Sequence, residues 1–350
     1  MRMAVDVMGG DHAPDAILKG CLAALELMEP TDELVLVGPR AEIGDALSER
    51  RVRDPRVTIE HASEVIGMDE SPVDSVKAKR DSSIVRMALL GSRKAERRCD
   101  FVLSAGNTGA CVSAATMHMR RLPGVHRPGI AVAFPNLHGG PVILCDAGAN
   151  PEPRPSHLWQ YGLMAETYAR QALGIARPRV AMMNIGAEEA KGTDLIRGAS
   201  ELLRATPDLN YVGFIEGRDF FEGATDVVVT DGFVGNTMLK MAEGLSRSLV
   251  RALTQEIISA DPALAVALEP VFKSFYAKND YHEYGGAPLL GVNGVCMIAH
   301  GSSEARTIRN AIRNSMAYVK HGVNDAIVSR LAALERAMAP LLHKHEAPAA

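Results

Sequence analysis

The chain has 350 residues, of which 47% are hydrophobic and 23% charged, an ordinary globular composition with enough length to bury a large core. It carries 38 lysines and arginines against 42 aspartates and glutamates, and the resulting formal net charge of −4 does not favour nucleic acid as a partner. No signal-peptide pattern opens the chain, and no apolar run approaches the roughly 18 residues of a spanning helix, so we expect a cytoplasmic protein.

The cysteines and histidines follow no disulfide or metal-binding pattern. The five cysteines lie in apolar stretches such as "PVILCDAG" and include no C-x-x-C pair, which predicts reduced thiols in the core. The eleven histidines have no H-E-x-x-H spacing, and no G-x-G-x-x-G dinucleotide fingerprint appears. We therefore expect neither a metal site nor a bound cofactor.

Short apolar runs recur along the chain, each followed by a glycine-bearing loop and a helix-like stretch. These runs lie at residues 3–7, 101–104, 142–146, 180–184, 226–230 and 295–300. Continuous apolar strands joined through helices predict a parallel sheet covered on both faces. We therefore expect a three-layer α/β/α fold with a mainly parallel, doubly wound sheet, in one domain over residues 1–342, and a flexible tail over residues 343–350.

The segment after the fifth run departs from this pattern. From Asn236 onward apolar residues recur every three or four positions, which predicts a long amphipathic helix. A second helical stretch follows, and we expect the pair to protrude from the sheet as an arm over residues 236–282. The apolar face of the second helix can pack on the body, on a dimer partner or on a membrane surface. Its residues are Leu264, Leu268, Phe272 and Phe275.

The loops that follow the strands are rich in groups that bind anions. Ligands of such sheets bind where the carboxyl ends of the strands line up, and we expect six polar loops to converge on that edge. Where a glycine-containing loop leads into a helix, the backbone N–H groups at the start of the helix can bind an anion. The same glycines can instead be needed only for a tight turn. We predict ligand contacts from Gly9, Gly10 and Asp11 in the first loop, and from Asn107, Thr108 and Gly109 in the second.

The stretch "NIGAEEAKGTD" at 184–194 places a lysine between an apolar strand and a helix start. A Walker A motif has its lysine after the second glycine, whereas Lys191 precedes Gly192, so this loop is not a nucleotide P-loop. Lys191 could form an exposed ion pair with Glu188 or Glu189. Its place at the ligand edge favours a catalytic role in binding an anion.

Other candidate catalytic groups are a carboxylate, an amide and two imidazoles. Asp231 and Asn236 flank a glycine pair in "DGFVGN", and His12 and His300 are candidate proton carriers. No G-x-S-x-G elbow and no cysteine with a paired histidine appears. A site without a covalent nucleophile suits a reaction in which the bound anion itself attacks.

Taken together, the loop motifs resemble those of the phosphate acyltransferases of bacterial phospholipid synthesis, the PlsX family. They occur in family order across nearly the whole chain, which makes the combination highly specific. The motifs are "DVMGGDHAP" at 6–14, "SAGNTGA" at 104–110, "CDAGAN" at 145–150, "NIGAEEAKG" at 184–192, "EGRD" at 216–219, "DVVVTDGFVGN" at 226–236, "EYGGAPLLGVNG" at 283–294 and "HGSS" at 300–303.

The resemblance implies reversible transfer of a long acyl group from acyl carrier protein to inorganic phosphate, by direct attack of bound phosphate on the thioester. The acyl phosphate formed would feed a downstream membrane glycerol-phosphate acyltransferase. The resemblance also implies a fold similar to isocitrate and isopropylmalate dehydrogenases and to phosphotransacetylases, a homodimer, and peripheral membrane contact. It adds Asn150, Ser302 and Ser303 to the predicted phosphate and acyl site.

Acidic acyl carrier protein would need a basic docking surface. One local cluster of basic residues is the best candidate for it. The alternative interpretation of this cluster is a solvated turn. The cluster is Arg120, Arg121, His126 and Arg127 in "MRRLPGVHRPG". Three other functions stay open. A soluble phosphotransacetylase would use acyl coenzyme A and needs no arm, a dehydrogenase would need a dinucleotide fingerprint, and a non-catalytic lipid or carrier-protein scaffold would not need the polar loops.

Overall fold

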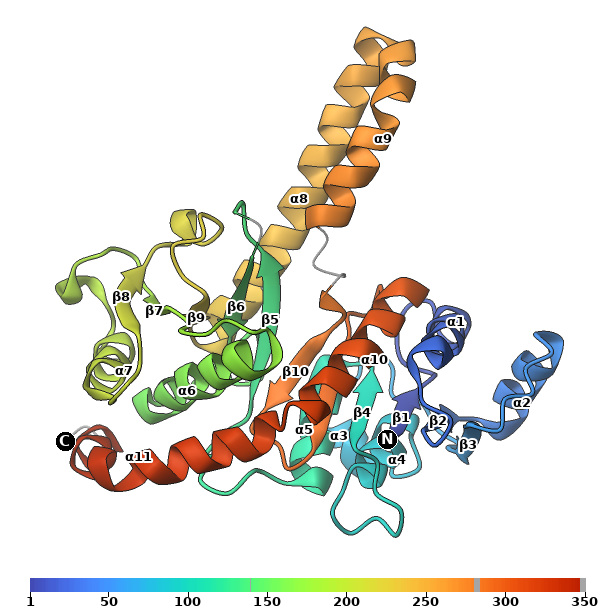
Figure 1. Ribbon diagram of the computed structural model, residues 1–350, viewed down its shortest axis with the longest axis horizontal. Coiled ribbons are helices and arrows are strands. Elements are labelled where there is room, and N and C mark those ends of the chain that lie inside the picture. Colours follow the sequence, from blue (N-terminus) through green and yellow to red (C-terminus); the bar gives the residue numbers. More distant parts are fainter. Residues whose placement is uncertain (139, 280–283, 347–350) are drawn as a thin grey trace.

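The computed structural model, which describes residues 1–138, 140–279 and 284–346, is a three-layer α/β/α structure around one mixed sheet (Figure 1). This confirms the predicted fold class. The strands of the sheet are β1 (Arg2–Asp6), β2 (Glu33–Gly38), β3 (Val57–His61), β4 (Phe101–Ser104), β5 (Gly129–Pro135), β6 (Pro141–Cys145), β7 (Val180–Met183), β8 (Tyr211–Ile215), β9 (Val227–Val229), β10 (Ala287–Leu290) and β11 (Val295–Ile298).

The direction of the strands reverses in the middle of the sheet. The strand order is β3-β2-β1-β4-β11-β10-β5-β6-β9-β7-β8. The outer groups are parallel, but β11/β10, β10/β5 and β5/β6 are antiparallel pairs. Three successive reversals make the two parallel groups run in opposite directions. The carboxyl ends therefore lie at two edges of the sheet, and the expectation that all six loops leave one edge is wrong.

The helices on one face of the sheet bury a single continuous core. This core extends from Met3 in β1 to Val229 in β9. Its apolar side chains come from both halves of the sheet and from the helices packed over them, because the runs between the polar loops are apolar throughout. The helices are α1 (Asp15–Ala24), α2 (Arg40–Glu49), α6 (Pro155–Ala172), α7 (Asp194–Ala205), α10 (Ala305–Lys320) and α11 (Val323–Glu346).

On the other face the core is divided into two. One part lies over the first half of the sheet, where it includes Ile84, Val102 and Ile298, and is covered by α3 (Pro72–Ala78), α4 (Ser83–Leu90) and α5 (Thr108–Ala114). The other part lies over the second half of the sheet and contains Phe134 and Phe220. The division falls at the reversed central strands.

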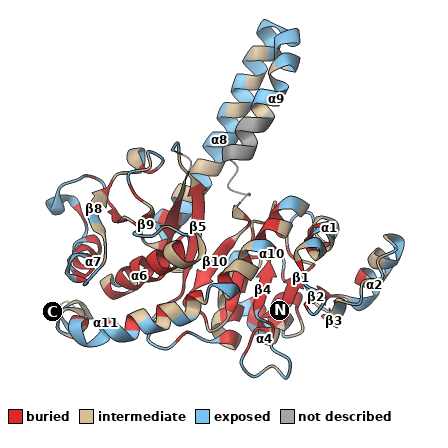
Figure 2. Cartoon of the chain, viewed as in Figure 1, coloured by how far each residue is buried: buried red, intermediate tan, exposed pale blue. Residues whose placement is uncertain are grey.

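Two long helices, α8 (Gly232–Ala260) and α9 (Pro262–Asn279), form the predicted protruding arm (Figure 1). Most residues of α8 beyond its first turns are exposed, whereas the strands at its base are buried (Figure 2). The Phe275 side chain lies outside the described residues. Among the residues that the structure describes, no helix is both long and apolar enough to cross a membrane.

The first turn of α8 lies directly on the loop that follows β6. The Asp231 carboxylate caps the helix by accepting the Val234 N–H at 2.8 Å. A Cβ atom on Gly235 would lie 1.9 Å from the Asp146 carbonyl oxygen, so only glycine permits this contact. At the other end of the chain, residues 343–346 of the predicted tail form the end of α11, where Lys344 Nζ contacts Glu201 at 2.7 Å.

We predict that Gly235→Ala lowers the free energy of unfolding by about 1–3 kcal/mol, the usual cost of overpacking. The matched control is Gly244→Ala on the same helix, where a Cβ meets no atom within 4 Å. That change should stabilise the helix by up to about 1 kcal/mol. Chemical denaturation of both variants measures the difference, and equal stability of the two would contradict the close contact at Gly235.

Candidate active site

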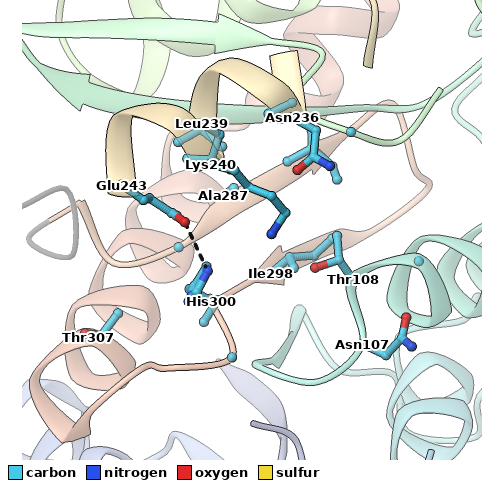
Figure 3. A pocket seen from close by; sticks show the side chains of 18 of the residues that line it. Asn107, Thr108, Asn236, Leu239, Lys240, Glu243, Ala287, Ile298, His300 and Thr307 are labelled. Carbon is cyan, nitrogen blue, oxygen red and sulfur yellow. Dashed lines mark ion pairs between the residues drawn. The ribbon is translucent and has the colours of Figure 1, made fainter. Parts of the chain in front are cut away.

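A cavity of about 460 Å³ lies in the gap between the two cores of the divided face (Figure 3). Its floor is formed by the central strands, and its walls by the loops after β1, β4, β6 and β11 and by the first turns of α8. Five of the predicted site residues line it together with His300. They are Asp11, Asn107, Thr108, Gly109 and Asn236.

The amide of Asn107 holds a neighbouring loop and has no free donor. Its Nδ2 donates to the carbonyl oxygens of Gly67, Met68 and Glu70 at 3.1–3.2 Å. Its Oδ1 accepts the Ala110 N–H at 3.0 Å and thereby caps α5. Asn107 therefore shapes the cavity wall by fixing the 67–70 loop. Thr108, the first residue of α5, is exposed toward the cavity instead.

The first turns of α8 present a continuous face to the cavity. Asn236, Leu239, Lys240 and Glu243 follow the spacing of one helix face and all line the cavity. The Lys240 ammonium points into the cavity between Thr108 and His300 (Figure 3). Within the described residues it forms no hydrogen bond or ion pair. Lys240 was not among the site residues expected from the sequence, although its position four residues after Asn236 was the available signal.

His300 is held from two sides. Its Nδ1 lies 2.8 Å from Ser302 Oγ, and its Nε2 lies 3.5 Å from Glu243 Oε2 on α8. The imidazole therefore links the loop after β11 to the base of the arm across the cavity (Figure 3). Ser302 contacts His300 but is not among the residues that line the cavity, and Ser303 is buried.

Two buried aspartates fix the loops on either side of the cavity. The Asp146 carboxylate accepts the N–H groups of Ile130, Gly148, Ala149 and Asn150 at 2.7–3.1 Å. Burial raises its pKa, while these hydrogen bonds act in the opposite direction. Burial also raises the pKa of Asp6, whose Oδ2 accepts the Ser104 hydroxyl at 2.7 Å. These carboxylates hold backbone in place and do not face the cavity.

Three other predicted residues also support the backbone. Asn150 lies in the loop after β6. Its carbonyl oxygen accepts the Gly232 N–H of α8 at 2.8 Å, and its side-chain Nδ2 donates to the Pro128 carbonyl oxygen at 2.6 Å. Asn150 therefore connects this loop to α8 and to the segment before β5. A Cβ on Gly9 would lie 2.6 Å from Gly106 N, so Gly9 lets the loops after β1 and β4 meet. Gly10 has φ +109°, which also requires glycine.

Lys191 lies after β7 and does not line the cavity. Its Nζ is 2.8 Å from Glu188 Oε1, and the hydrogen bond and charge of Glu188 raise the pKa of the ammonium. Both side chains are more than half exposed, so water screens this ion pair and it contributes little to stability. Exchanging Glu188 for a substrate anion would therefore cost little.

The predicted basic cluster surrounds a histidine at the start of α6. Burial, and then the charges of His126, Arg127, Arg154 and Arg121, lower the pKa of His157 to about 4. Its Nδ1 accepts the Arg154 N–H at 3.0 Å, which requires the unprotonated ring nitrogen. The structure thus adds Arg154 to the cationic groups found in the sequence. No group of three or more potential metal ligands occurs in the described residues.

The fold is shared with a solved phosphotransacetylase. A phosphotransacetylase from Streptococcus pyogenes superimposes with a TM-score of 0.63 over 91% of this chain and 94% of its own, at 16% sequence identity. At that identity the likeness establishes the shared fold alone.

Sequence relatives define the family more narrowly. The model of the family described as fatty acid synthesis protein matches residues 1–326. A phosphate acyltransferase of Geotalea daltonii is 42% identical over 95% of this chain and 94% of its own length. One from Desulfitobacterium hafniense is 45% identical over 95% and 98%. The chain belongs to this phosphate acyltransferase family, and it is an acyltransferase.

The low pKa of His157 predicts a pH-dependent stability. The unfolded chain takes up a proton near the ordinary histidine pKa of about 6.5, whereas the folded protein resists it until about 4. The free energy of unfolding should therefore fall as the pH drops from 6.5 to 4. His157→Gln keeps an acceptor for the capped N–H and removes the titration. Denaturation at pH 7 and pH 4.5 should show a smaller loss for the variant; an equal loss would refute the assignment.

Proposed function

We propose that the protein transfers a long fatty acyl group from acyl carrier protein to inorganic phosphate, forming acyl phosphate for phospholipid synthesis. The observation that carries this proposal is the ammonium of Lys240, which points into a cavity with an apolar floor and has no partner within the described residues. A cation in such a place favours an anionic ligand. Family membership supports phosphate as that anion.

The reaction needs no covalent intermediate with the enzyme. A phosphate oxygen attacks the carbonyl carbon of the thioester, and the electrons of the carbon–sulfur bond leave with the sulfur as a thiolate. Phosphate is already nucleophilic, so positioning it against the carbonyl is the main requirement. Lys240 would hold the phosphate, and the Asn236 amide would donate to the oxyanion that forms on the carbonyl oxygen.

Lys191 and Asp231 enter the proposal in different ways. A catalytic role of Lys191 is supported by its exposed ammonium, which is paired with Glu188, in the loop after β7. Strand β7 pairs with β9, after which α8 begins. Lys191 would act by leaving Glu188 and binding the substrate anion. Asp231 would act indirectly, since its carboxylate caps α8 and so positions Asn236 and Lys240. Asp11, Thr108 and Gly109 would form the opposite wall of the phosphate site. Gly10 would support that wall through its backbone conformation.

A phosphotransacetylase that uses acyl coenzyme A is the alternative favoured by the shared fold. The two donors differ in their demands on the surface, because carrier protein needs a docking face and coenzyme A does not. Comparing acyl carrier protein with acyl coenzyme A as donors separates the two functions. A scaffold is tested at the same time, since it would produce no acyl phosphate from either donor.

We predict that Lys240→Ala lowers acyl phosphate formation by roughly a hundredfold to a thousandfold, the range seen when a group that stabilises charge is removed. Lys191→Ala should also lower turnover strongly, without loss of stability, because its side chain is exposed. Lys77, which is exposed on α3, provides a control through Lys77→Ala. Formation of acyl phosphate at the wild-type rate by folded Lys240→Ala would eliminate the proposed role of this cavity.

Docking of acyl carrier protein on the basic surface around His157 is the second part of the proposal. Arg120 and Arg127 are exposed there, whereas Arg121 donates to the His126 carbonyl and so holds its own loop. Reversing charge at Arg120 and Arg127 should lower kcat/KM for acyl carrier protein by at least roughly tenfold at low salt. The same double reversal at Arg53 and Lys77 is the control. If the wild-type kcat/KM does not depend on salt, this surface is not the docking site.

The arm supports a homodimer and membrane contact. Met241, Leu245, Leu249 and Leu253 are each more than half exposed and repeat every four residues, so they form one apolar stripe along α8. A second copy of the chain would cover this stripe. Near the tip, Leu264 and Val266 of α9 are exposed, whereas Leu268 and Phe272 are half-buried. The tip is therefore the better candidate for membrane contact.

We predict that the protein co-sediments with vesicles of phosphatidylglycerol and that Leu264→Glu combined with Val266→Glu releases it, because charge opposes insertion of the tip. Val212→Glu, an exposed valine on the edge strand β8, is the control. The double variant should remain a dimer in analytical ultracentrifugation. Retention of vesicle binding by the double variant would contradict tip insertion.

A further inference from the structure

The floor of the cavity is apolar, in contrast to its walls. Ile130 and Val132 of β5 lie beside Ala287 of β10 and Ile298 of β11. Leu239 of α8 faces the same space and lies near Lys240 (Figure 3). The polar groups come from helix starts and loops, and the apolar ones from the strands beneath them. An occupant that satisfies both must carry an anionic group and an apolar chain.

Val132 lies where the two cores of the divided face come closest. It is half-buried and packs against both of them. Leu239 packs against the core of the second half of the sheet and also lines the cavity. On the opposite face of the sheet the core has no such division. The gap over Val132 is therefore apolar surface that the folded chain leaves uncovered and that an apolar ligand would cover.

We propose that the acyl chain lies in this gap, across Val132 with Leu239 beside it, and that Val132 determines how strongly chain length affects binding. This inference rests on the proposed function for the identity of the chain. The geometry orients the ligand, because Lys240 and Thr108 stand at the polar walls while the apolar floor continues between the two cores. The cavity is finite, so the gain in affinity should stop once the gap is full.

Alkyl phosphates test the inference without catalysis, because they carry the anionic group and the chain but no reactive carbonyl. We would measure binding of butyl, octyl and dodecyl phosphate by isothermal titration calorimetry below their micelle concentrations. Each methylene buried in the gap should tighten binding roughly fourfold. Octyl phosphate has four more methylenes than butyl phosphate, so for the wild-type protein we expect it to bind roughly 250-fold more tightly if all four are buried, and roughly sixteenfold if two are.

Two substitutions at one position separate the size of the gap from its polarity. Val132→Phe fills the gap and should reduce the ratio of octyl to butyl affinity to below roughly fivefold. Val132→Thr keeps the shape and adds a hydroxyl, and should lower the same ratio by roughly threefold to tenfold. Because the second variant has nearly the native volume, it tests the inference even if the first fails to fold. Val212→Phe on the edge strand is the matched control and should keep the wild-type ratio.

Three results would overturn the assignment. The first is equal affinity of the wild-type protein for butyl and octyl phosphate. The second is a wild-type affinity ratio in both Val132 variants. The third is an equal loss of affinity for both ligands, which would mean that Val132 supports the phosphate site and not the chain. The proposed function fails separately, if wild-type protein that binds octyl phosphate forms no acyl phosphate from any acyl thioester.

Discussion

Close packing of α8 on the loop after β6 is the contact on which the cavity depends. Gly235 approaches the Asp146 carbonyl so closely that no side chain fits between them. The Asp146 carboxylate fixes that loop through four backbone N–H groups, and the Asn150 carbonyl oxygen accepts the Gly232 N–H at the start of α8. The helix that leaves this contact carries Asn236 and Lys240 into the cavity and then continues as the arm. The close packing of Gly235 therefore determines where the Asn236 amide and the Lys240 ammonium lie.

The reversal of the central strands gives the cavity its apolar floor. A fully parallel sheet would carry helices along its whole length, and both faces would be covered. Here the antiparallel strands β10 and β5 join two oppositely directed groups, and on one face the core divides within β5, where Ile130 belongs to one part and Phe134 to the other. Half-buried Val132 lies between the two parts and packs against both of them. Loops from one half and a helix from the other then surround it with polar groups.

The sequence was most informative where structure depends on local pattern. Each of the six apolar runs overlaps a strand, because buried parallel strands need uninterrupted apolar residues. The arm was visible because amphipathic spacing persists over many turns. The reversal of the sheet could not be seen, since it depends on pairing between distant strands. The Asn107 amide donates to a loop about 40 residues earlier in the chain, so its role depends on a distant contact. The orientation of Lys240 likewise depends on how Gly235 packs against the Asp146 carbonyl.

We propose that phosphate binds in the cavity between the two cores and is held there by groups on α8. The most direct measurement is a crystal structure of the protein with inorganic phosphate at saturating concentration. We expect phosphate within hydrogen-bond distance of Lys240 Nζ, next to Asn236 and Thr108. Phosphate bound elsewhere, with this cavity empty under the same conditions, would contradict it.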